Sequence, residues 1–261
     1  MKKKIYHGSI KVIEKPVFGY GNIHNDYGLG FYCTEDLELA KEWAVNEIQD
    51  GYANIYEIEL EGLNILNLNQ PEYCFLHWLA LLLANRTFSI YFPLANEAKE
   101  YIIKNFLIDV SKYDVIIGYR ADDSYFSFAK DFINGTISYQ QLCMALKLGN
   151  LGEQFVLISK KAFDTLTFVG YEKALRNVYY PKKRERDLTA RKEYFNDTLL
   201  KRNKNDLYII QILNEEIGPD DPRLWWNLFK WRSNQFSGLF WLFNQRLKYS
   251  FRTILEHIHR L

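Results

Sequence analysis

Apolar residues recur along this chain with two different periods, which predict an alternation of strands and helices. Residues 55–60 alternate apolar with acidic side chains, the pattern of a strand with one buried face. Residues 37–48 carry apolar side chains at helical spacing, so they predict a helix that buries one face. We expect that helix to stop at a glycine cap near Asp50-Gly51.

The same two patterns, with turn residues between them, predict the other elements of the chain. Further strands are expected to begin at Ile5 and to cover 31–33, 63–68, 113–119, 154–159 and 165–169. Further helices are expected over 71–84, 95–107, 124–133, 138–147, 182–202 and 206–217. Strands and helices mixed in this way favour an α+β fold.

Charge and composition change near residue 170. Residues 1–170 hold 15 lysines and arginines against 21 aspartates and glutamates, whereas residues 171–261 hold 18 against 11. We therefore expect a first domain over 1–170 and a basic, aromatic-rich helical region over 171–261. A basic region beside an acidic domain suits either an anionic partner or a lid that docks on that domain.

The last part of the chain, residues 223–260, interleaves tryptophan and phenylalanine with basic side chains. Such a segment can bind nucleic acid through phosphate contacts and base stacking. The alternative, which we favour, is a helical bundle whose aromatic side chains pack on the first domain.

Cysteine usage and hydropathy bear on where the protein works. Cys33, Cys74 and Cys143 are widely spaced and form no CxxC motif, so they predict reduced thiols and no metal site. The longest apolar run, Leu79 to Ala84, is too short to span a bilayer. We expect a cytoplasmic protein with no membrane partner. The acidic pair Asp122-Asp123 can bind a metal or act as acid and base, but helix capping is the reading we favour.

A glycine-rich stretch, residues 26–43, holds the most distinctive chemistry. Gly28 and Gly30 permit backbone conformations that other residues resist, and Thr34 can cap the helix that follows. This arrangement brings Tyr32 and Trp43 to one neighbourhood, where two aromatic rings suit a flat, partly polar ring such as nicotinamide. The alternative is an ordinary strand and helix with a core tyrosine and tryptophan.

His7-Gly8-Ser9, followed by Gly30-Phe31-Tyr32, resembles the first two motifs of ADP-ribosyltransferases of the poly(ADP-ribose) polymerase and diphtheria toxin type. The resemblance implies a split, mostly antiparallel sheet, with NAD as the substrate and an unknown protein or nucleic-acid target. In that family the histidine bonds an NAD ribose hydroxyl and the glycine backbone holds the carboxamide. One aromatic stacks on the nicotinamide and a second, eleven residues later, covers its other face, as Tyr32 and Trp43 are spaced here. The implied cofactor-binding residues are His7, Gly8, Ser9, Tyr32, Thr34 and Trp43.

The third motif of that family places a catalytic glutamate at the start of a late strand. The matching segment here is 153–158, and alignment on Phe155 puts Gln154, rather than Glu153, in the catalytic position. A serine that contacts the carboxamide in the polymerases falls on Ala40. A glutamine keeps a hydrogen bond but loses the charge, so we expect NAD binding with slow or absent turnover, which Gln154→Glu should raise. The alternatives are a catalytically weak or dead NAD or ADP-ribose binding module, and a nucleic-acid interaction protein.

Overall fold

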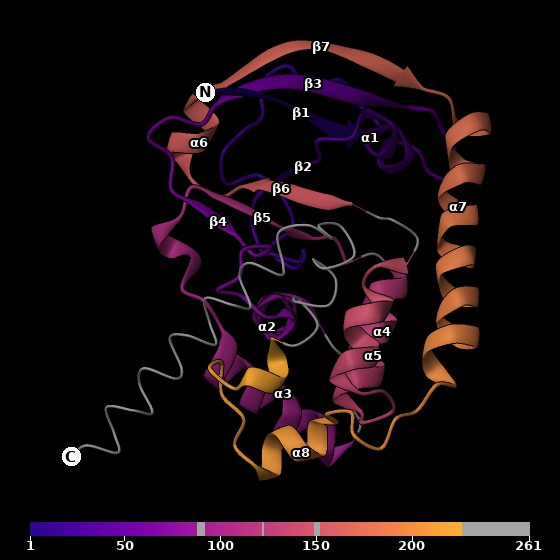
Figure 1. Cartoon of the computed structure of the whole chain (residues 1–261). Helices are drawn as coiled ribbons and strands as arrows, with labels where there is room; N and C mark the ends of the chain where they lie inside the picture. The colour runs from indigo at the N-terminus through magenta and orange to yellow at the C-terminus, as the bar shows by residue number, and fades with distance from the viewer. Residues whose placement is uncertain (88–91, 122, 149–151, 226–261) are drawn as a thin grey trace, which may run out of the picture. The chain divides into compact units, whose positions relative to one another are not determined.

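The computed structural model describes residues 1–87, 92–121, 123–148 and 152–225 (Figure 1). The chain divides into two compact units, residues 1–220 and 221–261. In the second unit the described part is 221–225, which holds a short 3₁₀ turn, Pro222–Leu224. The aromatic and basic residues from 226 onward, on which the nucleic-acid and bundle hypotheses depend, lie outside the described residues.

The strands described in the first unit form two sheets, which makes the fold α+β. One sheet is antiparallel and has the order β1 (Lys2–Ser9), β3 (Gly51–Glu59), β7 (Leu166–Ala174). The other has the order β2 (Phe31–Cys33), β6 (Glu153–Leu157), β5 (Val115–Tyr119), β4 (Ile65–Asn67). Strands β4 and β5 run parallel, and the other neighbours in this sheet are antiparallel. The domain boundary expected at residue 170 falls inside β7.

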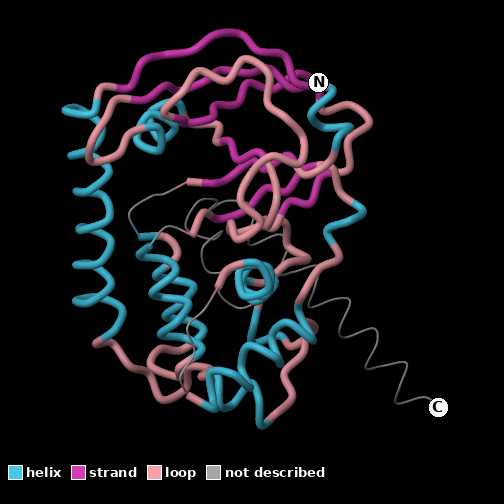
Figure 2. Tube along the Cα trace, turned by 180° about the vertical axis from the view of Figure 1, so that it is seen from behind, coloured by secondary structure: helices cyan, strands magenta, loops and turns pink. Residues whose placement is uncertain are grey.

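The helices of the first unit gather mainly on one side of these sheets. Figure 2 shows the strands at one end, helices α2 to α5 and α8 at the other, and α7 running alongside both. Their bounds are α1 (Leu37–Ala44), α2 (Phe75–Asn85), α3 (Pro93–Phe106), α4 (Asp123–Ile133), α5 (Tyr139–Ala145), α6 (Lys160–Asp164), α7 (Arg176–Glu193) and α8 (Ile209–Asn214). Among the described residues, no helix combines the length and the apolar character needed to cross a membrane.

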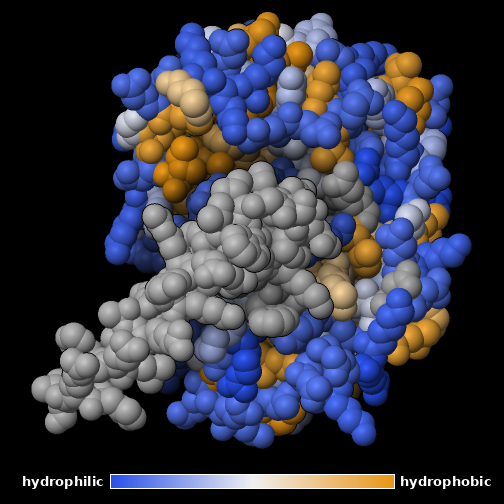
Figure 3. All heavy atoms as spheres, viewed as in Figure 1, coloured by the Kyte–Doolittle hydropathy of each residue, from blue (hydrophilic) through white to orange (hydrophobic). Residues whose placement is uncertain are grey.

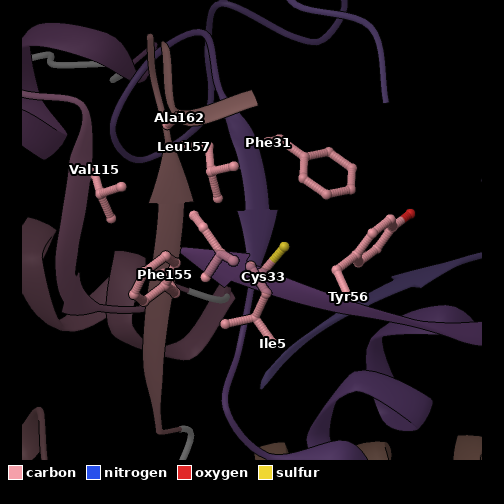
Figure 4. Packing of buried hydrophobic residues seen from close by; sticks show 9 residues of the cluster. Ile5, Phe31, Cys33, Tyr56, Val115, Phe155, Leu157 and Ala162 are labelled. Carbon is pink, nitrogen blue, oxygen red and sulfur yellow. The ribbon is translucent and has the colours of Figure 1, made fainter. Parts of the chain in front are cut away.

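A core of buried side chains fills the space between the two sheets (Figure 4). The strand β1 contributes Ile5 and β3 contributes Tyr56, while the second sheet contributes the alternate residues Phe31 and Cys33 of β2. Because successive side chains of a strand point to opposite faces, Tyr32 lies on the other face of its sheet. The three cysteines are free and buried, as their spacing predicts.

The first helix differs from the sequence prediction at both ends. Asp36, not Thr34, is its N-cap, and its carboxylate accepts the N–H groups of Glu38 and Leu39 at 2.8 and 3.1 Å. The predicted glycine cap at residue 51 was wrong, because the helix ends at residue 44 and Gly51 opens β3. A Cβ on Gly51 would lie 2.1 Å from the Ala44 carbonyl oxygen, so this glycine lets the chain turn back tightly on the helix.

The segment after β6 also departs from the pattern-based prediction. Helix α6 was not predicted at all, because five residues are too few for a helical period to be visible. Helix α7 begins at Arg176 rather than at 182 and contains Pro181. The first turns of α7, which the sequence pattern did not predict as helical, belong to a helix that packs against α1.

Charged side chains hold α7 against α1. Arg186 donates two hydrogen bonds to the buried Glu42, at 2.9 and 2.8 Å. Lys182 of α7 lies 3.4 Å from the Glu38 carboxylate of α1, and the Tyr179 hydroxyl donates to the same carboxylate at 3.1 Å. The outer side of the molecule along α7 is largely hydrophilic (Figure 3). Tyr179 and Tyr180 of α7 pack against the small apolar cluster of Ala44, Val45 and Ala174, so apolar contact accompanies the paired charges.

Glu42→Gln is expected to lower the free energy of unfolding by about 1.5–3 kcal/mol, because it removes the charge that two Arg186 hydrogen bonds depend on. Glu193→Gln, at the exposed end of α7, is the matched control and should change stability little. Urea unfolding monitored by circular dichroism measures both. Equal stabilities of the two variants would show that the pair does not hold α7.

Candidate functional site

The two sheets meet where β1 passes β2. Tyr6 and Thr34 exchange two backbone hydrogen bonds there, of 2.8 and 2.9 Å. The next residue of β1, His7, has its ring Nδ1 2.7 Å from the Tyr32 carbonyl oxygen. A carbonyl only accepts, so Nδ1 carries the proton and Nε2 is left as an acceptor. A hydrogen bond therefore joins the His7-Gly8-Ser9 motif directly to the Gly30-Phe31-Tyr32 motif.

Gly8 allows α1 to lie against β1. A Cβ at this position would be 2.2 Å from the Ala40 carbonyl oxygen, 2.8 Å from the Ala44 nitrogen and 2.9 Å from the Trp43 Cβ. No larger residue fits at these distances. This close approach brings Trp43 beside the strand that carries His7.

The Tyr32 ring is fixed by the loop before its strand. Its hydroxyl donates to the Gly28 carbonyl at 2.7 Å and accepts the Tyr27 N–H at 3.1 Å. Gly28 has a φ of +76°, a conformation that glycine adopts readily and other residues rarely. The glycine-rich stretch therefore positions the tyrosine rather than merely connecting two elements.

Gln154 lies on the same face of the second sheet as Tyr32. The register pairs Tyr32 with Val156, and Gln154 is two residues from Val156 along β6. Adjacent residues of a strand point to opposite faces, so Glu153 points away. Gln154 is 6% exposed, and its Oε1 has no hydrogen-bond partner among the described residues.

These side chains border one cavity of about 530 Å³, a size that suits a small-molecule site. It brings together His7, Gly8, Tyr32, Trp43 and Gln154, and with them the charged residues Asp26, Arg86, Arg120 and Lys183.

Three of the residues expected at the site do not border this cavity. The Ser9 hydroxyl oxygen accepts the Lys11 N–H at 3.2 Å at the end of β1. Thr34 and Glu153 instead border a second cavity, of about 390 Å³, together with the acidic Glu35 and Asp36. Among the described residues, no cluster of histidine, cysteine and carboxylate side chains could hold a metal ion.

Asp26, which no sequence motif marks as functional, is the buried acid of the cavity at 3% exposure. Its Oδ2 accepts the Ala121 N–H at 2.8 Å, and its Oδ1 lies 2.8 Å from the Arg86 Nε. Burial raises the pKa of the Asp26 carboxyl, against the opposing charges of Arg86 and Arg120 and the hydrogen bond from the Ala121 N–H. Its position as the first residue of the glycine-rich stretch was the sequence signal for it.

The positively charged residues of the cavity were also missed, because they come from distant parts of the chain. Arg86 follows α2, Arg120 follows β5, and Lys183 belongs to α7. The Arg120 guanidinium lies 4.2 Å from the centre of the Trp43 ring, a cation–π contact. These three cations outnumber the Asp26 carboxylate, so the cavity is positively charged. Burial lowers the pKa of His7 and favours its neutral form, so the histidine adds no charge.

Gly8→Ala is expected to cost about 1–3 kcal/mol of stability, because the new methyl group would overlap the Ala40 carbonyl and push α1 off β1. Gly218→Ala is the control, since a Cβ there meets nothing within 4 Å. Thermal unfolding compares the two. If Gly8→Ala proves as stable as the control, the close approach of α1 is not a constraint.

Comparison with known proteins adds one finding. The model of a family described as a protein of unknown function, DUF3990, matches residues 3–168. The matched range contains every motif position from His7 to Gln154. No curated protein and no solved structure matches the chain.

Proposed function

The chain belongs to the DUF3990 family, whose description assigns no activity, and we propose that its cavity binds NAD for ADP-ribosyl transfer to a macromolecular acceptor. The observation that carries this proposal is a convergence. His7, Tyr32, Trp43 and Gln154 come from β1, β2, α1 and β6 and border one cavity. These are the positions at which the resemblance to ADP-ribosyltransferases requires a common site.

The hydrogen-bonding groups of the cavity suit a ribose. His7 offers Nε2 as an acceptor, because Nδ1 is committed to the Tyr32 carbonyl. Gln154 offers Oε1, a buried acceptor that lacks a donor among the described residues. Buried acceptors are normally satisfied, so a ligand with two hydroxyl donors fits this pair. The neighbouring hydroxyls of the nicotinamide ribose are such donors.

The aromatic and charged groups suit the rest of the dinucleotide. Tyr32 and Trp43 provide ring faces for the nicotinamide, whose stacking contributes free energy beyond burial alone. Arg120 occupies a face of Trp43 in this structure, so it has to move if the nicotinamide is to stack there. The excess of positive charge from Arg86, Arg120 and Lys183 favours a diphosphate.

The transfer reaction breaks the bond between the nicotinamide nitrogen and the anomeric carbon of the ribose. Nicotinamide leaves with the bonding electron pair, and the acceptor's nucleophilic atom bonds to that carbon and loses a proton. The transition state resembles an oxocarbenium ion, as in glycoside hydrolysis. Gln154 brings no charge to stabilise it, so turnover is expected to be slow.

A second candidate function, a binding module without turnover, is favoured by the same glutamine. It shares the ligand and differs in the reaction, so it predicts NAD binding without nicotinamide release. Titration with NAD, together with an assay for nicotinamide, distinguishes the two functions.

NAD is expected to bind the wild-type chain, and Tyr32→Ala is expected to weaken binding by about 1–3 kcal/mol, the value of one stacked ring. Tyr32→Phe keeps the ring and loses only the hydroxyl bonds to the loop, so it should bind much more tightly than Tyr32→Ala. Isothermal titration calorimetry measures the dissociation constants.

The control for these variants is Tyr171→Ala, which removes an exposed tyrosine of β7 that does not border the cavity. It should bind NAD like the wild type. Undetectable NAD binding by a folded wild-type chain would reject the proposed function. Equal affinities of Tyr32→Ala and the control would reject the stacking role.

The pH dependence of binding is expected to report on His7. Burial lowers the pKa of this histidine, so Nε2 stays an acceptor from about pH 8 down to the ordinary histidine value near 6.5. NAD affinity should therefore be constant in this range and fall only at lower pH, where protonation turns Nε2 into a donor. Since the unfolded chain binds that proton more readily, the histidine's contribution to stability should also fall below about pH 6.5. An affinity that already declines between pH 8 and 7, or an unchanged profile in His7→Gln, would contradict this role.

A further inference from the structure

Buried polar atoms without a hydrogen-bond partner are concentrated at one cavity. Among the described residues these side-chain atoms are Asp26 Oδ1, Asn69 Oδ1, Arg86 Nε and Gln154 Oε1. Asp26, Arg86 and Gln154 all border the cavity of about 530 Å³. Because buried polar groups are normally hydrogen-bonded, this concentration points to a ligand that completes them.

The Asp26 carboxylate and the Arg86 guanidinium lie together without satisfying each other. Arg86 Nε is 2.8 Å from Asp26 Oδ1, so the two side chains form an ion pair. The Nε–H group is not directed at that oxygen, and neither atom has a hydrogen bond among the described residues. The pair therefore presents one donor and one acceptor next to each other.

Contacts away from these two atoms hold both side chains in place. Asp26 Oδ2 accepts the Ala121 N–H at 2.8 Å, and the residue is 3% exposed. The Arg86 Cζ lies 5.1 Å from the centre of the Phe126 ring, a cation–π contact. A donor and an acceptor that are already fixed lose little further freedom when a ligand binds them.

The pair lies near the ring on which the nicotinamide is proposed to stack. Tyr27, the residue after Asp26, donates its N–H to the Tyr32 hydroxyl at 3.1 Å. Tyr32, Asp26 and Arg86 border the same cavity. A nicotinamide that stacks on Tyr32 carries its carboxamide at the edge of its ring, where a donor and an acceptor are needed.

We propose that Asp26 and Arg86 form a subsite for a primary carboxamide, in which Asp26 Oδ1 accepts an amide N–H and Arg86 Nε donates to the amide oxygen. A primary amide carries its donor and its acceptor on one carbon, which matches two protein atoms that lie close together. The identity of this amide, the carboxamide of NAD, rests on the proposed function.

This subsite adds to the contacts that the resemblance implies. In ADP-ribosyltransferases the glycine backbone holds the carboxamide. A carboxamide has two N–H donors and two lone pairs on its oxygen, so it can bind backbone groups and the side-chain pair together. The consequence is specificity, because a carboxylate in the same place offers no donor to Asp26 and is repelled by its charge.

The overall charge of the cavity predicts the opposite preference. Arg86, Arg120 and Lys183 outnumber Asp26, so a general attraction would favour the nicotinic acid form of the dinucleotide, which carries an additional negative charge. The interaction between two charges weakens with distance, so the nearest charge has the largest effect. The sign of the preference therefore distinguishes the subsite from general attraction.

A comparison of three dinucleotides on the full chain tests the subsite. Isothermal titration calorimetry is performed with NAD, with its 3-acetylpyridine analogue, in which a methyl group replaces the amide nitrogen, and with its nicotinic acid analogue. The wild-type chain should prefer NAD over each analogue by at least about tenfold, since each leaves a buried acceptor without a donor. Equal affinity for NAD and the 3-acetylpyridine analogue would overturn the proposal.

Asp26→Asn assigns this preference to its residue. An asparagine can still accept the Ala121 N–H, but it removes the charge and can present a donor to the cavity. The preference for NAD over the 3-acetylpyridine analogue should fall to about one or below, and the nicotinic acid analogue should become the tighter ligand of the other pair. Asp164→Asn, which removes an exposed carboxylate of α6 that does not border the cavity, should keep both wild-type ratios.

The outcomes separate this subsite from the proposed function. Wild-type ratios that persist in a folded Asp26→Asn chain would overturn the subsite, and if that variant does not fold, the wild-type ratios still decide. Binding of all three dinucleotides with equal affinity would overturn the subsite alone. A folded wild-type chain that binds none of them would overturn the subsite and the proposed function together.

Discussion

The crossing of β1 and β2 is the constraint on which the rest of the site depends. Two backbone hydrogen bonds between Tyr6 and Thr34 fix it, and they join two sheets whose other strand pairings, among the described residues, stay within each sheet. With that register set, His7 reaches the Tyr32 carbonyl, and Gly8 lies beneath α1. Because side chains alternate along a strand, a shift of one residue in β1 would turn His7 to the other face and separate it from β2.

The sequence predicted the parts of the site that depend on local spacing. His7, Tyr32 and Trp43 belong to short motifs, and alternation along β6 separates the faces of Gln154 and Glu153. The sequence could not predict the charged residues of the cavity, because Arg86 and Arg120 come close to Asp26 only through the tertiary fold. The end of α1 was missed for a related reason, since a tight contact between Gly51 and Ala44 overrides the helical pattern. The α+β class followed from the elements, whereas the ADP-ribosyltransferase topology stays a prediction.

The glutamine at position 154 makes physical sense beside Asp26. A second carboxylate there would share a buried space with the first, and both would resist ionisation. A neutral amide avoids this repulsion and still provides a buried acceptor, the Gln154 Oε1. On our proposal, glutamine in place of the glutamate of ADP-ribosyltransferases accompanies a different buried acid, Asp26, and its cost is weaker stabilisation of a cationic transition state.

The central claim is that one cavity holds the nicotinamide end of NAD between Tyr32 and Trp43. A crystal structure of the full chain with NAD tests it most directly. The account predicts a nicotinamide ring between those two side chains, ribose hydroxyls within hydrogen-bond distance of His7 and Gln154, and an Arg120 guanidinium moved off the Trp43 ring. NAD bound outside this cavity, or bound with Arg120 still over Trp43 and the nicotinamide remote from Tyr32, would contradict it.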